Sequence, residues 1–246
     1  MPRFFVKPEQ VADGTITVTG NDVNHIKNVL RMSCGDEISV SDGCGRDYFC
    51  TIDEIGREQI LLHIENSWDS YVELPAKLYL FQGLPKGDKM ELIIQKAVEL
   101  GVYEIIPVVT ARTIVKLDAK KEAKKLARWQ LVARSAAKQS GRGMIPKVAA
   151  PISFKEAVAA AKKLDMAVMP YERAKGMDAA RGLVHSMRGK KSIGIFIGPE
   201  GGFDCSEVSQ ALAANIETMT LGQRILRTET AGLTVLSILM FELEEN

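Results

Sequence analysis

Two glycine-containing loops hold the residues of this sequence whose types and spacing could do chemistry. The first loop, Ile197 to Phe203 (IGPEGGF), directly follows the strand-like run SIGIF. Its glycines remove side chains, so backbone N–H and C=O groups can approach a ligand closely. The second loop, Leu221 to Gly232 (LGQRILRTETAG), adds Arg227 and Glu229 near the start of a helix. Because ligands of open α/β sheets bind at the carboxyl ends of the strands, the two loops predict a small-ligand site.

The spacing of the first loop disfavours the common nucleotide sites. It is neither a G-x-G-x-x-G fingerprint nor a G-K-[ST] phosphate loop, and no metal-binding acid stands at the standard spacing. Each loop also has a plainer interpretation. The first could be a tight turn, and the second could be a helix start in which Thr228 is the N-cap and Glu229 complements the helix dipole. The loops by themselves leave these alternatives open.

Two kinds of sequence surround the loops. Residues 1 to about 70 contain short β-branched or alternating runs separated by glycines, which is typical of a small β-barrel. One short helix is expected there, from Asp22 to Met32, with Asn21 or Asp22 as its cap. After Pro75, strand-like and helical runs alternate, which indicates a parallel sheet with helices on both faces. The sequence therefore predicts two domains, residues 1–72 and residues 73–246, the second of the α/β class.

The α/β region begins with the strand AKLYLFQGL and the amphipathic helix KGDKMELIIQKAVELG. Asp88 and Glu91 have capping-box spacing at the start of that helix. The later strands are YEIIPVVT, MAVMP, SIGIFIG and ETMTL. The later helices are a basic one from about Asp118 to Ser140, two opened by Ser153 with Glu156 and by Asp204 with Glu207, and an apolar one from Thr228 onward.

The net charge of +1 conceals an uneven distribution. From Arg112 to Lys147 there are eleven Lys/Arg and two Asp/Glu, so this stretch carries +9 and the remainder carries −8. Such asymmetry indicates a surface that faces a polyanion, although a solvated helix face would look the same. No apolar run reaches the ~18 residues of a membrane span, and the first residues lack a secretory signal. We therefore expect a cytoplasmic protein that does not bind membranes.

The cysteines do not indicate a metal site. They are Cys34, Cys44, Cys50 and Cys205. None of them forms a C-x-x-C pair, and His25 and His63 do not supply the closely spaced ligands that zinc requires. We expect free thiols in a reducing compartment and no bound metal.

Five segments of the chain, in order, resemble the RsmE family of the SPOUT superfamily. Besides IGPEGGF and LGQRILRTETA, they are NHIKNVLRM (24–32), KMELIIQKAVELGV (89–102) and QSGRGMIP (139–146). The resemblance covers most of the chain and implies a PUA-like β-barrel for RNA binding over residues 1–72. It also implies a SPOUT methyltransferase domain over residues 73–246, in which the C-terminal segment forms a trefoil knot, a very rare feature.

The resemblance further implies a cofactor and an assembly. S-adenosyl-L-methionine would bind in the two loops, largely through backbone groups. By position the binding residues are Ile197, Gly198, Glu200, Gly201, Gly202, Leu221, Gly222, Ile225, Leu226 and Arg227. The family usually forms homodimers, for which the apolar helix 231–241 is a candidate interface, although a purely internal role for that helix is equally compatible with its sequence.

The reaction that the resemblance implies is methylation of N3 of a uridine in small-subunit (16S) ribosomal RNA, free or within the subunit. The methyl donor is already activated, so the protein mainly aligns the reacting atoms. The N3 proton must leave to a carboxylate or to water, and charge develops on the uracil oxygens. We therefore expect Glu229 or Glu200 to be the catalytic base and Arg227 to stabilise charge, with structural roles as the alternative for each carboxylate.

RNA recognition is expected from basic residues outside the two loops. The resemblance points to Arg3, His25, Arg31 and Arg142, and helical spacing adds Arg134 and Lys138, which share one stripe with Arg142. Two other functions remain open from the sequence. One is a SPOUT enzyme with another target, such as a ribose 2′-hydroxyl, and the other is a non-catalytic RNA-binding protein of ribosome assembly.

Overall fold

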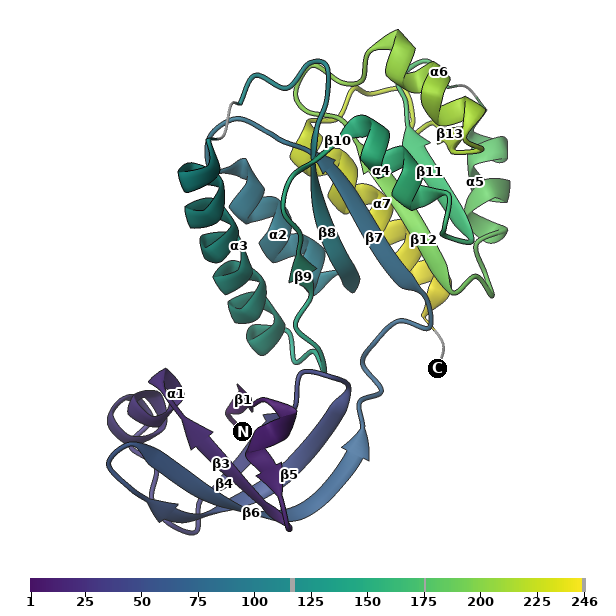
Figure 1. The fold of residues 1–246 in the computed structure, drawn as a ribbon. Helices are drawn as coiled ribbons and strands as arrows, with labels where there is room; N and C mark the ends of the chain where they lie inside the picture. The colour runs from purple at the N-terminus through teal and green to yellow at the C-terminus, as the bar shows by residue number, and fades with distance from the viewer. Residues whose placement is uncertain (116–117, 175, 245–246) are drawn as a thin grey trace. The chain divides into compact units, whose positions relative to one another are not determined.

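The computed structural model describes residues 1–115, 118–174 and 176–244, and the chain divides into two compact units (Figure 1). The first unit comprises Met1–Glu73 together with Ala137–Ile145, and the second comprises Leu74–Ala136 with Pro146–Asn246. The segment Ala137–Ile145 therefore belongs to the N-terminal unit, whereas the sequence predicted a second domain over residues 73–246 that would include it.

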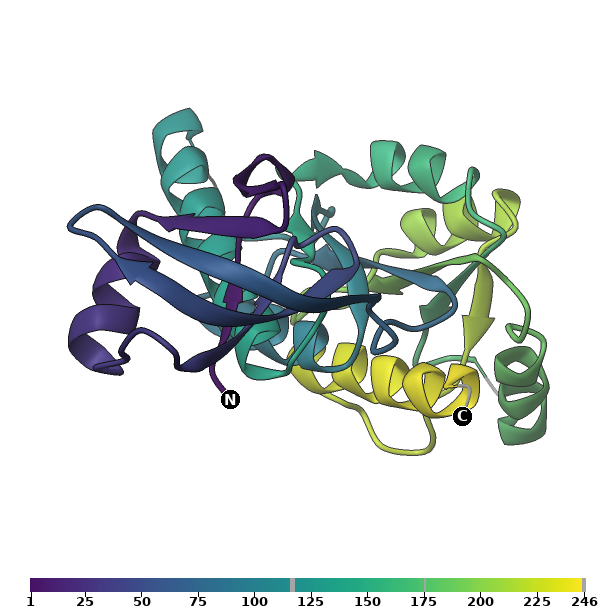
Figure 2. The same ribbon diagram turned by 90° about the horizontal axis from the view of Figure 1, so that it is seen from below.

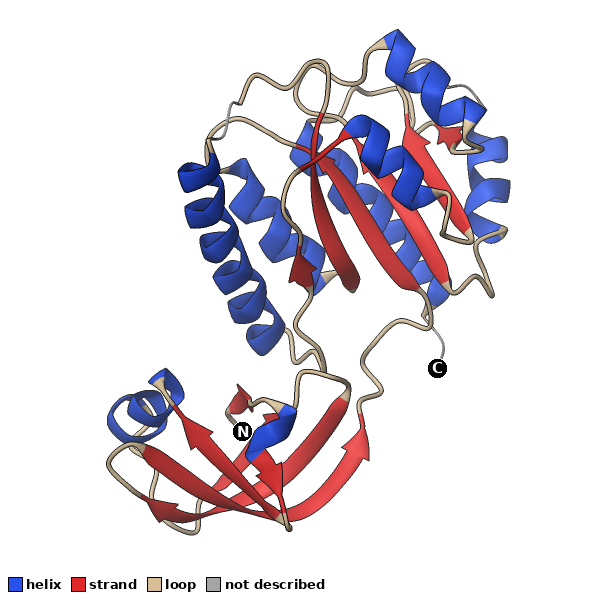
Figure 3. Cartoon of the chain, viewed as in Figure 1, coloured by secondary structure: helices blue, strands red, loops and turns tan. Residues whose placement is uncertain are grey.

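The first unit is built on a six-stranded sheet. Its strands are β1 (Arg3–Phe5), β2 (Val11–Ala12), β3 (Thr15–Thr19), β4 (Glu37–Ser41), β5 (Arg46–Ile55) and β6 (Gln59–Asp69), in the order β1-β4-β5-β6-β3-β2 (Figure 3). β1 and β4 are parallel, and the other pairs are antiparallel. Within the described residues β1 and β2 are the two edges of the sheet, so its hydrogen bonds do not close into the predicted barrel. Alternate residues such as Ile16, Val18, Ile38 and Val40 form the core.

The helix of this unit differs in detail from the prediction. It consists of α1 (Asn21–Asn24), which continues as a π-helical turn, η2 (His25–Val29). Its N-cap is Gly20, at φ 73°, rather than Asn21 or Asp22. A π-turn widens the helix and often occurs at functional sites. Arg31, two residues after η2, adopts the left-handed φ of 54° that few residues other than glycine occupy.

The segment Ala137–Ile145 is held in the first unit by Glu73. The Glu73 carboxylate accepts hydrogen bonds from Nε and Nη2 of Arg142 and from the backbone N–H of Gly143. The hydroxyl of Ser41 donates to the Gly143 carbonyl (2.9 Å). A Cβ at Gly143 would overlap Ser70, so glycine is required for this close approach. The Arg142 side chain is buried as a result.

The second unit is organised around an all-parallel sheet, as predicted. Its strands are β7 (Lys77–Gly83), β8 (Val102–Val109), β9 (Lys147–Val148), β10 (Ile152–Ser153), β11 (Met166–Pro170), β12 (Ser192–Ile197) and β13 (Glu217–Met219). The order is β10-β8-β7-β12-β11-β13, with β9 also paired to β8. Since β8 lies on one side of β7 and β11 lies on the far side of β12, the β7/β12 pair is the topological switch point where such sheets bind ligands.

Helices cover both faces of this sheet. They are α2 (Lys89–Glu99), α3 (Ala119–Gln139), α4 (Phe154–Ala161), α5 (Met177–His185), α6 (Cys205–Ala213) and α7 (Thr228–Leu243). Figures 1 and 2 show α4 and α6 on one face of the strands and α2 and α7 on the other. The predicted capping boxes of α4 and α6 are present. Asp88 is the N-cap of α2 without a side-chain hydrogen bond, and Arg227, not Thr228, is the N-cap of α7.

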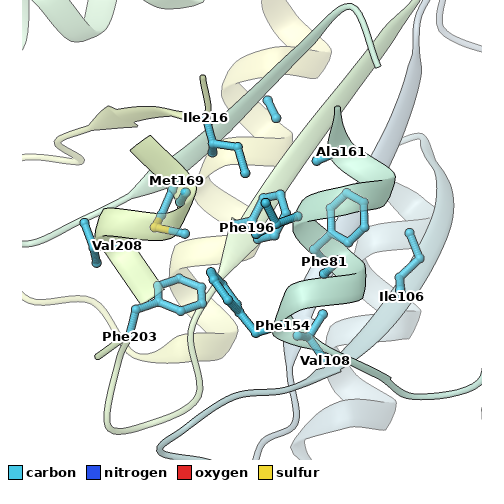
Figure 4. Packing of buried hydrophobic residues seen from close by; sticks show 14 residues of the cluster. Phe81, Ile106, Val108, Phe154, Ala161, Met169, Phe196, Phe203, Val208 and Ile216 are labelled. Atoms are coloured by element: carbon cyan, nitrogen blue, oxygen red, sulfur yellow. The ribbon is translucent and has the colours of Figure 1, made fainter. Parts of the chain in front are cut away.

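An aromatic core lies between the sheet and the helices α4 and α6 (Figure 4). Phe81 of β7 and Phe196 of β12 stack with ring centroids 4.5 Å apart, and Phe154 of α4 meets Phe196 edge-on at 6.1 Å. Phe203, which ends the first glycine loop, packs against Phe154 at 5.6 Å. This core therefore anchors both ends of the loop that follows β12.

On the opposite face, a buried polar contact joins the two glycine loops. The side chain of Gln82, at the end of β7, donates from Nε2 to the hydroxyl of Thr228 (2.9 Å). That hydroxyl donates in turn to the Gly198 carbonyl (2.6 Å). Thr228 is not the N-cap that the sequence predicted, because its hydroxyl bonds across the unit instead of to its own helix.

We expect Thr228→Val to lower the free energy of unfolding by about 1–3 kcal/mol, because it leaves the Gly198 carbonyl and the buried Gln82 amide without this partner. Urea unfolding of the purified protein measures the change. The matched control is Thr230→Val, the same substitution at an exposed position in the same helical turn. An equal effect of the two substitutions would show that the Thr228 hydroxyl has no special role.

Candidate functional site

A cavity of about 410 Å³ opens at the carboxyl ends of β11, β12 and β13. This volume is in the usual range of small-molecule sites. Three loops line it, 170–172, 197–203 and 220–227, together with Lys89 of α2 and with Thr228 and Ala231 of α7. The cavity therefore lies at the carboxyl edge of the sheet, next to the switch point, where α/β sheets bind ligands.

Glycines let the backbone of the first loop fold tightly beside this cavity. A Cβ at Gly198 would lie 2.9 Å from backbone atoms of Gly202, and a Cβ at Gly83 would lie 2.6 Å from the nitrogen of Pro199. Gly202 and Gly222 adopt φ values of 67° and 106°. Any larger residue would force these segments apart or strain them. The cavity wall is therefore largely backbone.

The Glu200 carboxylate ties the first loop to the start of α2. Its Oε1 accepts hydrogen bonds from the backbone N–H of Lys86 (3.1 Å) and from Nζ of Lys89 (2.9 Å). Burial acts to raise the pKa of the Glu200 carboxyl, but the hydrogen bonds from Lys89, from its own backbone and from Lys86 outweigh burial and hold the pKa below its ordinary value. Glu200 is thus ionised at neutral pH and lies in the cavity wall.

Glu229 lies in the first turn of α7 but is not among the residues that line the cavity. Its Oε2 is buried, has no hydrogen-bond partner within the described residues, and lies 3.6 Å from Nζ of Lys89. The positive end of the α7 dipole also favours a carboxylate here. This geometry fits a structural role for Glu229 better than direct contact with a reacting group.

All ten residues assigned to cofactor binding from the sequence line the cavity. They are Ile197, Gly198, Glu200, Gly201, Gly202, Leu221, Gly222, Ile225, Leu226 and Arg227. Arg227 and Arg224 are exposed there, and Ile225 is 89% exposed. Two of the three expected catalytic residues, Glu200 and Arg227, thus line the cavity with the two glycine loops.

Several residues of the site were not predicted from the sequence. Residues 170–172, at and just after the end of β11, line the cavity. Their signal in the sequence was the end of the strand MAVMP, which lies next to the strand before the first loop. Lys89 was seen only as part of a helix. Arg112 donates from Nη1 to the Gly201 carbonyl (2.7 Å), and the backbone N–H of Ala111 donates to Glu207 (2.8 Å). The loop after β8 therefore supports the first glycine loop from outside.

The residues expected to bind RNA differ in how exposed they are and in which side chains they contact. Arg31 and Arg134 are exposed. Arg3 forms an ion pair with the buried Asp47, and half-buried His25 meets the Phe4 ring edge-on.

Lys138 and Arg142 are held within the first unit. Nζ of Lys138 lies 3.4 Å from Asp22 and 3.6 Å from the centre of the Phe4 ring. Arg142 is only 4% exposed and is bonded to Glu73, which corrects its assignment to an RNA-facing stripe. The sequence showed the helical spacing of Arg142 but not the carboxylate that buries it.

Two further features bear on ligands. Within 1–115, 118–174 and 176–244, no cluster of His, Cys, Asp and Glu could hold a metal ion. None of the helices in that same part of the chain is long and apolar enough to cross a bilayer. Cys50 is buried, and burial raises the pKa of its thiol to about 12, so it is an unreactive core residue.

Two family models match the chain. Residues 72–240 match the RNA methyltransferase domain, and residues 18–65 match the RNA methyltransferase PUA domain. Among curated relatives, "Ribosomal RNA small subunit methyltransferase E" of Bacillus subtilis is 38% identical, covering 99% of this chain and 98% of its own length. The protein of the same name from Synechocystis is 33% identical, covering 96% and 76%.

Solved structures agree with this result. A ribosomal RNA small subunit methyltransferase E from Neisseria gonorrhoeae, bound to S-adenosyl methionine, is 35% identical with a TM-score of 0.84, over 98% of this chain and 97% of that one. A putative methyltransferase from Legionella pneumophila, in complex with the same cofactor, is 28% identical with a TM-score of 0.83, over 97% and 96%. With both of its units matched along their length, the chain belongs to the ribosomal RNA small subunit methyltransferase E (RsmE) family of RNA methyltransferases.

Proposed function

We propose that this protein transfers the methyl group of S-adenosyl-L-methionine to N3 of a uridine in small-subunit ribosomal RNA. The observation that carries the proposal is the cavity at the carboxyl ends of β11, β12 and β13, lined by all ten residues expected to bind the cofactor. Family membership and the two relatives with bound cofactor support the same ligand.

The residues present suit this cofactor. Backbone groups of the loops 197–203 and 220–227 would bind its polar atoms, since glycines keep side chains away there. Apolar side chains of Ile197, Leu221 and Leu226 line the same wall and suit an adenine ring. The cofactor, when bound, supplies a methyl group on a positively charged sulfur, which is already activated for attack.

The chain's own residues then align the base and manage a proton. A bond forms between uracil N3 and the methyl carbon as the carbon–sulfur bond breaks, and the N3 proton leaves. We assign Glu200, ionised and in the cavity wall, as the acceptor of that proton, directly or through water. Arg227, exposed at the cavity, stabilises negative charge on the uracil oxygens. Glu229 is assigned a structural role.

Nucleoside analysis of ribosomal RNA tests the proposed reaction. Small-subunit RNA from cells lacking this protein, treated with the purified enzyme and labelled cofactor, is expected to gain N3-methyluridine. RNA that remains unmethylated would contradict the activity, and label on a ribose 2′-oxygen would support the other SPOUT target instead. A non-catalytic RNA-binding protein would also bind no S-adenosyl-L-methionine in calorimetry.

The two carboxylates provide a matched pair within the same assay. Glu200→Gln is expected to lower the methylation rate at saturating cofactor by about 10²–10⁴-fold, the usual contribution of a general base. Glu229→Gln at saturating cofactor is expected to keep most of the rate. The reverse ranking would move the proton acceptor to Glu229.

We propose that the first unit binds the RNA. Arg31 is exposed at the end of the helix α1–η2 in a left-handed conformation, and strained residues are often retained at functional sites. Arg3, His25 and Lys138 lie in the same unit and belong to the same proposal, with side chains partly engaged by Asp47, Phe4 and Asp22. Arg134, exposed on α3, belongs to the second unit and is a separate proposed RNA contact.

Arg31→Asn is expected to weaken binding of small-subunit RNA about tenfold and to reduce the slope of log affinity against log salt by about one, as for the loss of one phosphate contact. Asparagine tolerates the positive φ, so the backbone stays in place. Filter binding at several salt concentrations measures both quantities. Arg57→Asn, at an exposed site in the β5–β6 turn, is the control, and equal losses in both variants would refute a specific role.

We propose in addition that the chain is a homodimer through α7. Phe241 is 85% exposed and Ile238 of the same helix is 38% exposed, an unusual pair of large apolar side chains to leave in water. Phe241→Glu is expected to yield monomers in sedimentation equilibrium. Leu212→Glu, at a 51% exposed position on α6, is expected to leave the dimer intact. A monomeric wild-type protein would remove the proposal.

The trefoil knot is also part of the proposal. After the edge strand β13, the chain returns across the sheet, and α7 packs against β12 and α2. Thr228 holds the start of α7 against the loop after β12. An experimental density map, traced from residue 190 to residue 243, would reveal whether the chain threads a loop or passes beside it.

A further inference from the structure

Lys89 occupies a position between two carboxylates that come from separate parts of the chain. Its Nζ lies 2.9 Å from Oε1 of Glu200, in the loop after β12, and 3.6 Å from Oε2 of Glu229, in the first turn of α7. Lys89 itself begins α2, after β7. One ammonium group therefore connects three segments that follow three different strands.

The local sequence does not favour a lysine at this place. Lys89 is the first residue of α2, where the positive end of the helix dipole repels a cation. The acidic Glu91 in the same turn is the residue type that this end prefers. Hydrogen bonding to Glu200 outweighs the effect of desolvation and raises the pKa of the Lys89 ammonium above its ordinary value. Its tertiary partners, not its helix, thus stabilise the charge.

Glu229 depends on the same ammonium. Its Oε2 is buried and has no hydrogen-bond donor within the described residues, so Lys89 at 3.6 Å is the cation that compensates it. A partly buried carboxylate that loses the cation beside it is destabilised. Without Lys89, Glu200 and Glu229 would be two like charges with no cation between them.

We propose that Lys89 is a positioning residue for cofactor binding, which acts by clamping Glu200 and Glu229 and thereby holding the loop 197–203 against the start of α7. The inference rests on the proposed function, because it concerns the same cavity. Loop 197–203 supplies half of the expected cofactor-binding residues, and Glu200 is the side chain that links it to α2. Lys89 therefore fixes the cavity wall in its binding shape before any ligand arrives.

Calorimetry with S-adenosyl-L-methionine tests the clamp directly. Lys89→Met is expected to weaken binding about tenfold, the loss of one charge-assisted hydrogen bond. Lys89→Arg, which keeps a donor for both carboxylates, is expected to restore most of the affinity. Lys86→Met is the matched control, because it removes a neighbouring lysine whose side chain is exposed and whose contact with Glu200 is made by the backbone.

A double-mutant cycle separates positioning from direct contact. If Lys89 acts through Glu200, the double variant Lys89→Met/Glu200→Gln binds the cofactor no more weakly than the weaker single variant. If Lys89 instead binds the cofactor itself, the two losses add, and the proposal is overturned.

Hydrogen exchange in the protein without ligand gives a readout independent of activity. Backbone amides of 198–202 are expected to exchange faster in Lys89→Met and Glu200→Gln than in wild type. In Lys86→Met their exchange rates are expected to equal those of the wild type. If Lys89→Met does not fold, Glu200→Gln removes the same contact from the Glu200 side. That variant must then show the same faster exchange of amides 198–202. Unchanged exchange in both variants would overturn the clamp. Absence of cofactor binding by the wild-type protein would instead refute the proposed function.

Discussion

The buried hydroxyl of Thr228 is the contact on which the rest of this site depends. It accepts a hydrogen bond from Gln82 at the end of β7 and donates one to Gly198 in the loop after β12. Both strands of the switch point are thereby joined to the helix that begins after the last strand. Because buried polar groups are costly to leave unpaired, this arrangement holds three backbone segments at a single relative position. The glycine loops can then form a wall made largely of backbone.

A group of charges restrains the first glycine loop. The first turns of α2 and α7 bring together Lys89 and Glu229, and Glu200 completes the group from the first loop. Arg112 supports that loop from outside through the Gly201 carbonyl. The aromatic core around Phe196 anchors the strand before the loop and Phe203 after it. The loop is thus restrained at both ends and along its length, which suits a site whose task is alignment rather than strong acid–base chemistry.

In the first unit, the Glu73 carboxylate gives Arg142 a structural role. Arg142 belongs to a segment whose charge and helical spacing indicate a nucleic-acid surface. In the folded chain Glu73 binds its guanidinium, and glycine at position 143 allows the close approach to Ser70. The segment is consequently a structural part of the N-terminal unit. Arg31, by contrast, remains exposed on a short helix that ends in a π-turn.

The sequence by itself determined the parallel α/β unit and the capping boxes of α4 and α6, because period and caps are local signals. The resemblance of its two glycine loops to one family indicated ten of the residues that line the cavity. Only the tertiary structure decided that Thr228 bonds to Gln82 rather than capping α7, that Arg142 is buried on Glu73, and that Lys89 lies between Glu200 and Glu229. Each of these outcomes joins residues that are 69 or more positions apart. No local pattern encodes such a pairing, because its energy depends on burial and on partners that meet only when the strands are assembled.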